Sequence, residues 1–276
     1  MLAKPLVAFS ASQLVALDSL RVNFKDRTSD VNFKLDNLLY IRYLRARNFE
    51  AIKATTMLEK TIQWRSSFNI DSMKTWRRIL DNENSTGKLY VRGFSEEGNA
   101  LIYAKPKFEN STSHDGKMKH FVFTMEKAVK SMDHQGRGAE KLIIIIDLNG
   151  YSILNAPPMQ TAIETINVFQ NHYPERLHRA YVINPPYIFM VLYNLISPLL
   201  DANTKSKVRM LSDPDAIKKE LLSQVDAEVL EAGYGGCDVR QFDSALYMAA
   251  PLEQDFASVV NSGGTVSSGK QKHSIV

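Results

Sequence analysis

One run of six residues, Leu142 to Asp147 (LIIIID), limits the possible folds more than any other part of this sequence. Its five aliphatic residues leave no polar face, so a strand formed here has to be covered on both sides. Strands of this kind occur in parallel sheets that carry helices on both faces. The sequence therefore predicts an α/β fold with a mainly parallel sheet.

The neighbouring segments alternate between strand and helix patterns, which is typical of a parallel sheet with right-handed crossovers. The polar segment 81–87 (DNENSTG) is predicted to be a loop. Runs rich in β-branched and aromatic residues predict further strands at 89–94, 100–105, 179–183 and 208–211. Apolar spacings of three and four predict helices at 117–133, after Pro157-Pro158, at 186–199 and at 215–222.

The first part of the chain shows helical patterns only. Ser10 and Gln13 are spaced as a capping box, and two further helical patterns follow. We therefore expect an all-helical N-terminal lobe over residues 1–75 and an α/β lobe over residues 85–245. The Ser/Gly-rich segment 259–276 is predicted to be a disordered tail.

Composition excludes several classes of protein. The net charge is only +4 and no long Lys/Arg run occurs, so the sequence does not indicate a nucleic-acid partner. Cys237 is the only cysteine, which indicates a reducing compartment and no disulfide framework. The most apolar stretch, 188–200, is shorter than the ~20 residues of a spanning helix. We expect a cytoplasmic monomer that meets membranes transiently as a peripheral protein.

Catalytic and metal-binding motifs are not found in the sequence. It contains no nucleophile elbow, no phosphate-binding glycine loop, and no histidine pair at metal-ligand spacing. Asp147 is the one carboxylate at an enzyme-like position, the end of a buried strand. It would act either as a general base or as a tether for the Asn149-Gly150 turn, and the second interpretation is favoured. We therefore expect no enzyme, no catalytic residue, no metal and no cofactor.

The predicted helix at 186–199 carries almost no polar residue, although a surface helix normally has one apolar stripe. It is either a helix buried in the core or a helix whose outer face meets lipid for part of the time. Composition does not separate these interpretations.

Several motifs around this helix resemble those of the CRAL-TRIO family, specifically its yeast-type phosphatidylinositol-transfer branch. The resemblance covers roughly residues 35–245. It implies a lipid cavity inside the α/β lobe, closed by a mobile gate helix at 186–199. In chain order the motifs are LLYIRYLRARNF (38–49), IDLNGYS (146–152), YPER (173–176), VINP (182–185), LDANTKSKV (200–208) and YGG (234–236).

The resemblance also implies a phosphatidylinositol headgroup site made by Arg42, Glu175, Thr204 and Lys207. Lys207 and Thr204 would serve phosphate oxygens by charge and by hydroxyl donation. Glu175 would accept hydrogen bonds from inositol hydroxyls, or it would hold a cation such as Arg42 in place. The gate residues implied in the same way are Tyr187, Phe189, Met190, Leu192, Tyr193 and Ile196.

Contacts to a second lipid headgroup, that of phosphatidylcholine, are only partly retained. Tyr103 and Ser152 are candidates, but Leu154 and Met125 stand where the family pattern has hydroxyl groups. A buried phosphate loses about 1–3 kcal/mol for each missing hydrogen bond. We therefore expect phosphatidylcholine binding to be weak or absent.

The function implied is binding of one phospholipid, with phosphatidylinositol as the expected cargo, and its transfer between membranes. One alternative is a carrier or sensor of another hydrophobic ligand, such as a sterol precursor, a retinoid or tocopherol. Another is a scaffold that does not transfer lipid but presents it, with a lipid kinase as a candidate partner.

Overall fold

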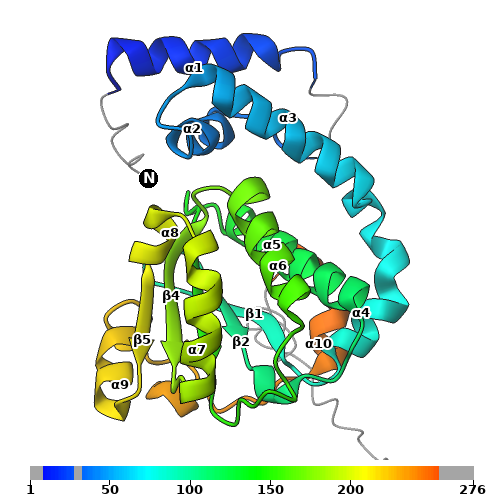
Figure 1. Cartoon of the computed structure of the whole chain (residues 1–276), viewed down its shortest axis with the longest axis vertical. Helices are drawn as coiled ribbons and strands as arrows, with labels where there is room; N and C mark the ends of the chain where they lie inside the picture. The colour runs from blue at the N-terminus through cyan, green and yellow to red at the C-terminus, as the bar shows by residue number, and fades with distance from the viewer. Residues whose placement is uncertain (1–8, 28–32, 255–276) are drawn as a thin grey trace, which may run out of the picture.

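The computed structural model describes residues 9–27 and 33–254, which form a helical lobe and an α/β lobe (Figure 1). Each lobe has its own hydrophobic core. The predicted tail at 259–276 lies outside the described residues.

Three helices pack together in the helical lobe, with Leu20, Leu44 and Leu58 fully buried between them. The predicted capping box is confirmed, because Ser10 Oγ accepts from the Gln13 N–H and the Gln13 side chain accepts from the Ser10 N–H. The helices are α1 (Ala11–Asn23), α2 (Asn37–Arg45) and α3 (Ala51–Ser67).

A 3-10 helix, η1 (Ile70–Trp76), and the helix α4 (Arg77–Asn84) connect the two lobes. Ile70 and Trp76 are buried in the core of the α/β lobe. The change from one core to the other therefore falls just after α3, a few residues earlier than the end of the predicted helical lobe.

The predicted loop at 81–87 is wrong for its first four residues, which belong to α4. Polar residues favoured the loop prediction, but one of them, Asn84, is fully buried. Its Nδ2 donates to the Leu80 carbonyl at 2.9 Å, and its Oδ1 lies 2.9 Å from Nε2 of His120. A polar side chain with such partners in the core allows the helix to continue as far as Asn84.

The α/β lobe contains one five-stranded sheet in the order β1-β2-β3-β4-β5. β1 pairs antiparallel with β2 at one edge, and the remaining pairs are parallel, so the predicted mainly parallel sheet is confirmed. The strands are β1 (Leu89–Phe94), β2 (Ala100–Ala104), β3 (Leu142–Asp147), β4 (Leu177–Ile183) and β5 (Val208–Leu211).

Three helices lie over one face of the sheet (Figure 1). They are α5 (His114–Gln135), α6 (Met159–His172) and α7 (Tyr187–Ile196). The other elements of the lobe are η2 (Pro106–Phe108), η3 (Ser197–Leu199), α8 (Ala202–Ser206), α9 (Pro214–Leu222), η4 (Ala232–Tyr234) and α10 (Ser244–Ala249).

The parallel strands all end at one edge of the sheet, called here the carboxyl edge, and begin at the opposite, amino edge. Asp147 lies at the carboxyl edge, where its Oδ1 accepts from the Asn149 N–H at 2.9 Å and its Oδ2 accepts from the Tyr234 hydroxyl at 3.0 Å. This confirms that Asp147 tethers the turn after β3.

The two lobes meet where α3 packs against α5 and α6. The Trp64 ring stacks on the His172 ring at 4.1 Å between centroids. Arg65 donates to both carboxylate oxygens of Glu126, at 2.8 and 2.9 Å, and the Tyr173 hydroxyl donates to Glu126 at 2.8 Å. Burial alone would raise the pKa of Glu126, but the Arg65 charge and the hydrogen bonds outweigh it and lower that pKa.

Substituting Arg65 by alanine leaves the Glu126 carboxylate buried without its cation. The free energy of unfolding, measured by chemical denaturation, is expected to fall by about 3 kcal/mol. The loss should shrink below the ordinary glutamate pKa of 4.5. At such pH a protonated Glu126 no longer needs the cation, and the stability that its lowered pKa gives the wild type also disappears.

The exposed pair of Arg77 and Asp81, 2.7 Å apart on α4, provides the matched control. Arg77→Ala is expected to cost less than about 1 kcal/mol. Equal effects of the two substitutions would show that the Arg65–Glu126 pair does not join the lobes.

Candidate lipid-binding site

A cavity of about 420 Å³ lies between the sheet and the helices α5, α6 and α7. Apolar side chains make up most of its lining, and Lys88, Glu109, Lys117 and His120 also border it. We call it the apolar cavity. Leu200, Thr204 and Val208 line it toward the amino edge, and Asn155 and Pro157 line it toward the carboxyl edge. The apolar side chains around its middle are Ile102, Ile144, Ile146 and Val182 from the strands, and Phe121, Met125, Ile166, Phe169, Phe189, Tyr193 and Ile196 from the helices.

The alternation of side chains along β3 separates the cavity from the core. Ile143 and Ile145 are fully buried on the face packed against the core, whereas Ile144 and Ile146 line the cavity and stay partly accessible. The run LIIIID is therefore apolar on both faces for two different reasons. One face packs against side chains, and the other leaves space for a ligand.

Helix α7 spans the cavity but buries none of its own side chains. Phe189, Tyr193 and Ile196 line the cavity, at the spacing of one helix face. Tyr187 and Leu195 point away from it and are exposed. The interpretation of this segment as an ordinary core helix is therefore wrong.

The other two predicted gate residues, Met190 and Leu192, are partly exposed and do not line the apolar cavity. Pro186 precedes α7 and Pro198 lies in the 3-10 turn after it, so the helix is short and bounded on both sides. These are the features expected of a cover that moves as a unit.

Three of the predicted headgroup residues come together at the amino edge. Glu175 accepts from Asn203 Nδ2 at 2.7 Å, and its other carboxylate oxygen lies 3.9 Å from Lys207 Nζ. Thr204 lines the apolar cavity, and its hydroxyl donates to Asp201 at 2.7 Å. We call Glu175, Asn203, Thr204 and Lys207 the amino-edge cluster.

Local backbone geometry explains how this cluster forms. Glu175 has a φ of 58°, a left-handed conformation that is uncommon outside glycine. It turns the chain between α6 and β4 and brings the carboxylate toward α8. Asp201 caps α8 through the Thr204 N–H at 2.8 Å, which fixes the start of that short helix. Burial lowers the pKa of the Lys207 ammonium, and the nearby Glu175 carboxylate opposes that shift.

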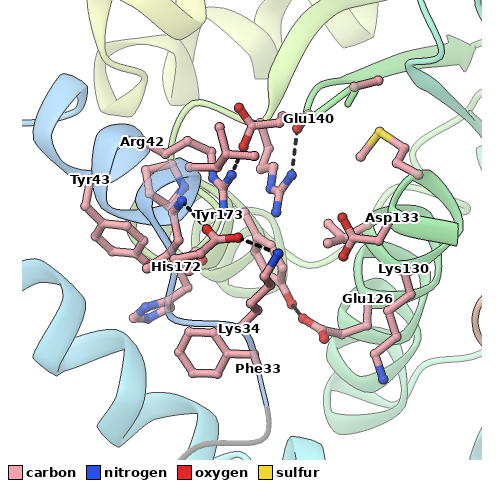
Figure 2. Close-up of a pocket in the computed structure, with 18 of the residues that line it drawn as sticks. Phe33, Lys34, Arg42, Tyr43, Glu126, Lys130, Asp133, Glu140, His172 and Tyr173 are labelled. Atoms are coloured by element: carbon pink, nitrogen blue, oxygen red, sulfur yellow. Dashed lines mark hydrogen bonds and ion pairs between the residues drawn. The ribbon is translucent and has the colours of Figure 1, made fainter. Parts of the chain in front are cut away.

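Arg42 lies in a second cavity, of about 540 Å³, between the two lobes (Figure 2). Its guanidinium forms a short ion pair with Glu140. Arg176 donates to the Glu140 carbonyl at 2.8 Å, and burial together with the neighbouring Arg42 charge lowers the pKa of Arg176 to about 10. The carboxylate that holds Arg42 is therefore that of Glu140, and the suggestion that Glu175 holds it is wrong.

The two cavities lie on either side of the turn at 173–176. Pro174 and Arg176 line the interlobe cavity, while Glu175 belongs to the amino-edge cluster. Sequence reasoning missed Asn203 and Glu140. Asn203 lies inside the quoted motif LDANTKSKV, so its position beside Thr204 was a usable signal, whereas nothing in the sequence connects Glu140 with Arg42.

The two candidates for a second headgroup do not line the apolar cavity. Tyr103 is fully buried on the opposite face of the sheet, where its ring stacks against Tyr90 and Tyr234. The reason is strand alternation, because its neighbours Ile102 and Ala104 take the cavity face. Ser152 lies in the turn after β3, where its N–H donates to Asn155 Oδ1 at 2.8 Å.

The two apolar replacements for hydroxyl groups are placed differently from each other. Met125 lines the cavity and is almost fully buried. Leu154 projects into solvent, so the idea that it removes a hydroxyl from the cavity is wrong. Met125 is therefore the one of these two replacements that takes the place of a hydroxyl inside the cavity.

Among the residues that the structure describes, no group of His, Cys, Asp or Glu is arranged to hold a metal ion. Within the same residues, none of the helices has the length and apolar character needed to cross a bilayer.

A parallel sheet with an apolar cavity on one face, an exposed apolar helix across it and a polar cluster at one end define a lipid-binding α/β domain. The family model for the CRAL/TRIO domain matches residues 84–236, more than half of the chain. The chain therefore belongs to the CRAL-TRIO family of lipid-binding and lipid-transfer proteins.

Two relatives and one solved structure illustrate the similarity. The SEC14 cytosolic factor of Eremothecium gossypii is 28% identical over 255 residues, which cover 85% of this chain and 80% of that protein. The phosphatidylinositol transfer protein PDR17 of Saccharomyces cerevisiae is 32% identical over 185 residues, 63% of this chain and 52% of that protein. The crystal structure of Sfh5 has the same fold, with a TM-score of 0.67 at 19% identity over 85% of this chain and 91% of that chain.

Some relatives are much longer than this chain. It spans about half the length of PDR17. It spans 18% of a CRAL-TRIO domain-containing protein from Schizosaccharomyces pombe that is 30% identical over 196 residues, or 71% of this chain.

Hydrogen exchange tests whether α7 is a movable cover. Amides of residues 187–196 are expected to exchange much faster than those of β3, because α7 buries no side chain and belongs to the low-stability part of the fold. Adding vesicles should change exchange in α7 and leave β3 unchanged. Protection of α7 equal to that of β3 in both conditions would contradict the assignment.

Proposed function

We propose that this chain binds one phospholipid, phosphatidylinositol, in the apolar cavity and carries it between membranes or presents it to a membrane enzyme such as a lipid kinase. The observation that carries the proposal is the continuity of the cavity with the amino-edge cluster. Thr204 belongs to both, so one ligand with apolar chains and a polar head would contact both.

Each polar residue of the cluster suits one part of an inositol phospholipid head. Lys207 supplies a charge for a phosphate oxygen, and the Thr204 hydroxyl would donate to a phosphate oxygen in place of its partner Asp201. Glu175 accepts hydrogen bonds and suits inositol hydroxyls. Arg42 would reach such a head only by exchanging its partner Glu140 for phosphate, which makes it the least direct of the four predicted contacts.

The size of the cavity indicates that α7 moves when the cargo is bound. Pockets of 300–1,000 Å³ suit ligands of drug size. A phospholipid with two acyl chains is larger than such ligands, and the cavity has about 420 Å³. Helix α7 would therefore lie further from the sheet in the loaded protein, which its lack of buried side chains allows.

Energetics favour a carrier whose cavity matches the bilayer. Taking an acyl chain out of water is worth about 0.8 kcal/mol per CH₂ group, and two chains would be held too tightly if water were their source. Because the chains come from a bilayer, they move from one apolar environment to another when they enter the apolar cavity. The polar head then sets selectivity, because unpaired polar groups in a site discriminate strongly.

A smaller hydrophobic ligand, such as a sterol precursor, a retinoid or tocopherol, is the second candidate. It is favoured by the cavity volume of about 420 Å³, which lies within the range of pockets that hold small ligands. It would leave Lys207 and Glu175 at the amino edge without a ligand partner, and for that reason phosphatidylinositol is preferred. On either account the chain is a carrier in the cytoplasm, not a catalyst, and visits membranes transiently.

Lys207→Ala is expected to reduce phosphatidylinositol transfer between vesicles at least about tenfold, because it removes a charge-assisted hydrogen bond. Lys205→Ala is the matched control, since Lys205 lies on the same short helix segment with an exposed side chain. It should leave transfer unchanged. Phosphatidylcholine, assayed in parallel, should move slowly with either protein, because Met125 offers no hydroxyl. Unchanged phosphatidylinositol transfer by Lys207→Ala would refute the headgroup assignment.

A further inference from the structure

We infer that the loop at 151–159, which follows β3, docks this protein on a lipid bilayer by inserting Ile153 and Leu154 into the membrane interface. The inference concerns where the protein touches the membrane and holds whichever lipid the cavity carries. We call residues 151–159 the docking loop.

The tip of the docking loop is apolar and extends into solvent. Leu154 is 94% exposed, the largest value among the large hydrophobic side chains of the described residues, and Ile153 is 68% exposed. Met159, the first residue of α6, is exposed as well. Neighbouring apolar side chains held in water indicate a surface that is covered by a partner.

Hydrogen bonds hold the tip in this position. Asn155 Oδ1 accepts from the Ser152 N–H at 2.8 Å, and Asn155 Nδ2 donates to the Gly150 carbonyl at 3.1 Å. The Asn155 N–H donates to the Ser152 carbonyl at 3.2 Å, which closes a turn around Ile153 and Leu154. The two side chains are thus presented by a built turn, and little further ordering is needed when they enter a membrane.

The docking loop adjoins both the cover helix and the apolar cavity. The Tyr151 ring packs edge-on against Phe189 of α7, with 5.9 Å between centroids, and Asn155 and Pro157 line the cavity. Tyr187, at the start of α7, is 84% exposed. A bilayer that receives the loop tip would therefore lie close to the exposed start of α7, the helix that covers the cavity.

The groups beside the loop suit the polar part of a bilayer. The aliphatic stem of Lys107 lies against Gly150, and Lys107 Nζ is 5.0 Å from the centre of the exposed Phe108 ring. A lysine and an aromatic ring next to an aliphatic tip are the groups that settle at the headgroup level of a membrane. This charge favours a bilayer that contains anionic lipid.

Vesicle binding by Ile153→Ser/Leu154→Ser tests the inference. The vesicles contain phosphatidylcholine and phosphatidylserine and no phosphatidylinositol, so that docking is scored without the proposed cargo. The apparent Kd for vesicles is expected to rise at least about tenfold, because two aliphatic side chains no longer enter the interface. The melting temperature should not change, because both side chains are already exposed.

Val22→Ser/Ile52→Ser is the matched control, with exposed aliphatic residues of α1 and α3 in the helical lobe, away from the docking loop (Figure 1). It should bind vesicles as the wild type does. An equal loss in both double variants would show that exposed aliphatic surface in general, and not the docking loop, drives binding.

Depth is measured with an environment-sensitive dye on Leu154→Cys in a Cys237→Ser background. Vesicles should shift the dye emission to the blue, and quenchers on acyl chains should reduce it, whereas a dye on Ile52→Cys should stay in water. A dye at position 154 that stays in water would overturn the inference. So would wild-type vesicle binding by the double serine variant, or a wild-type dimer that this variant turns into a monomer, since a second copy would then be the partner. Wild-type docking together with a failure to transfer phosphatidylinositol between vesicles would refute the proposed cargo and leave this inference intact.

Discussion

The unfilled face of the sheet is the feature on which the rest of this structure depends. Ile144 and Ile146 point into space that no other side chain fills, while Ile143 and Ile145 pack into a close core. Apolar surface that faces such a space gains about 25 cal/mol per Å² when a ligand removes it from water. The fold therefore has a strong physical reason to hold an apolar ligand, and the cover, the polar cluster and the exposed loop tip all adjoin that space.

The elements around the cavity divide the work of a lipid carrier. The cavity offers acyl chains an apolar environment that resembles the interior of a bilayer. It therefore accommodates the chains but distinguishes poorly between different lipids. In the proposed function the amino-edge cluster would contribute discrimination, because Lys207 and Glu175 are only partly exposed and would lose hydration on binding a lipid head. Helix α7 would lower the barrier to lipid exchange in the same proposal, since one of its apolar faces covers the cavity and the other is exposed. The ion pair between Arg65 and Glu126 holds the helical lobe against the α/β lobe. It does not line the apolar cavity.

Much of the fold could be predicted from the sequence because its signals are local. LIIIID, the capping box at Ser10 and the strand patterns each reflect spacing within one element, and each was confirmed. Asn84 was missed because burial of a polar side chain depends on a distant partner, His120. Tyr103 and Leu154 were misjudged because the face that a strand residue takes, and the direction of a loop tip, follow from pairing and turn geometry. Glu140 was missed because no sequence pattern links it to Arg42, from which it is 98 positions away.

Native mass spectrometry of the protein purified from the cells that make it, with identification of the released lipid, tests the central claim most directly. The account predicts one phospholipid per chain, with the mass of a phosphatidylinositol, and loss of that species in Lys207→Ala but not in Lys205→Ala. A sterol, retinoid or tocopherol in the cavity would contradict the proposed cargo. A chain that binds no hydrophobic molecule at all would contradict the account of the apolar cavity itself.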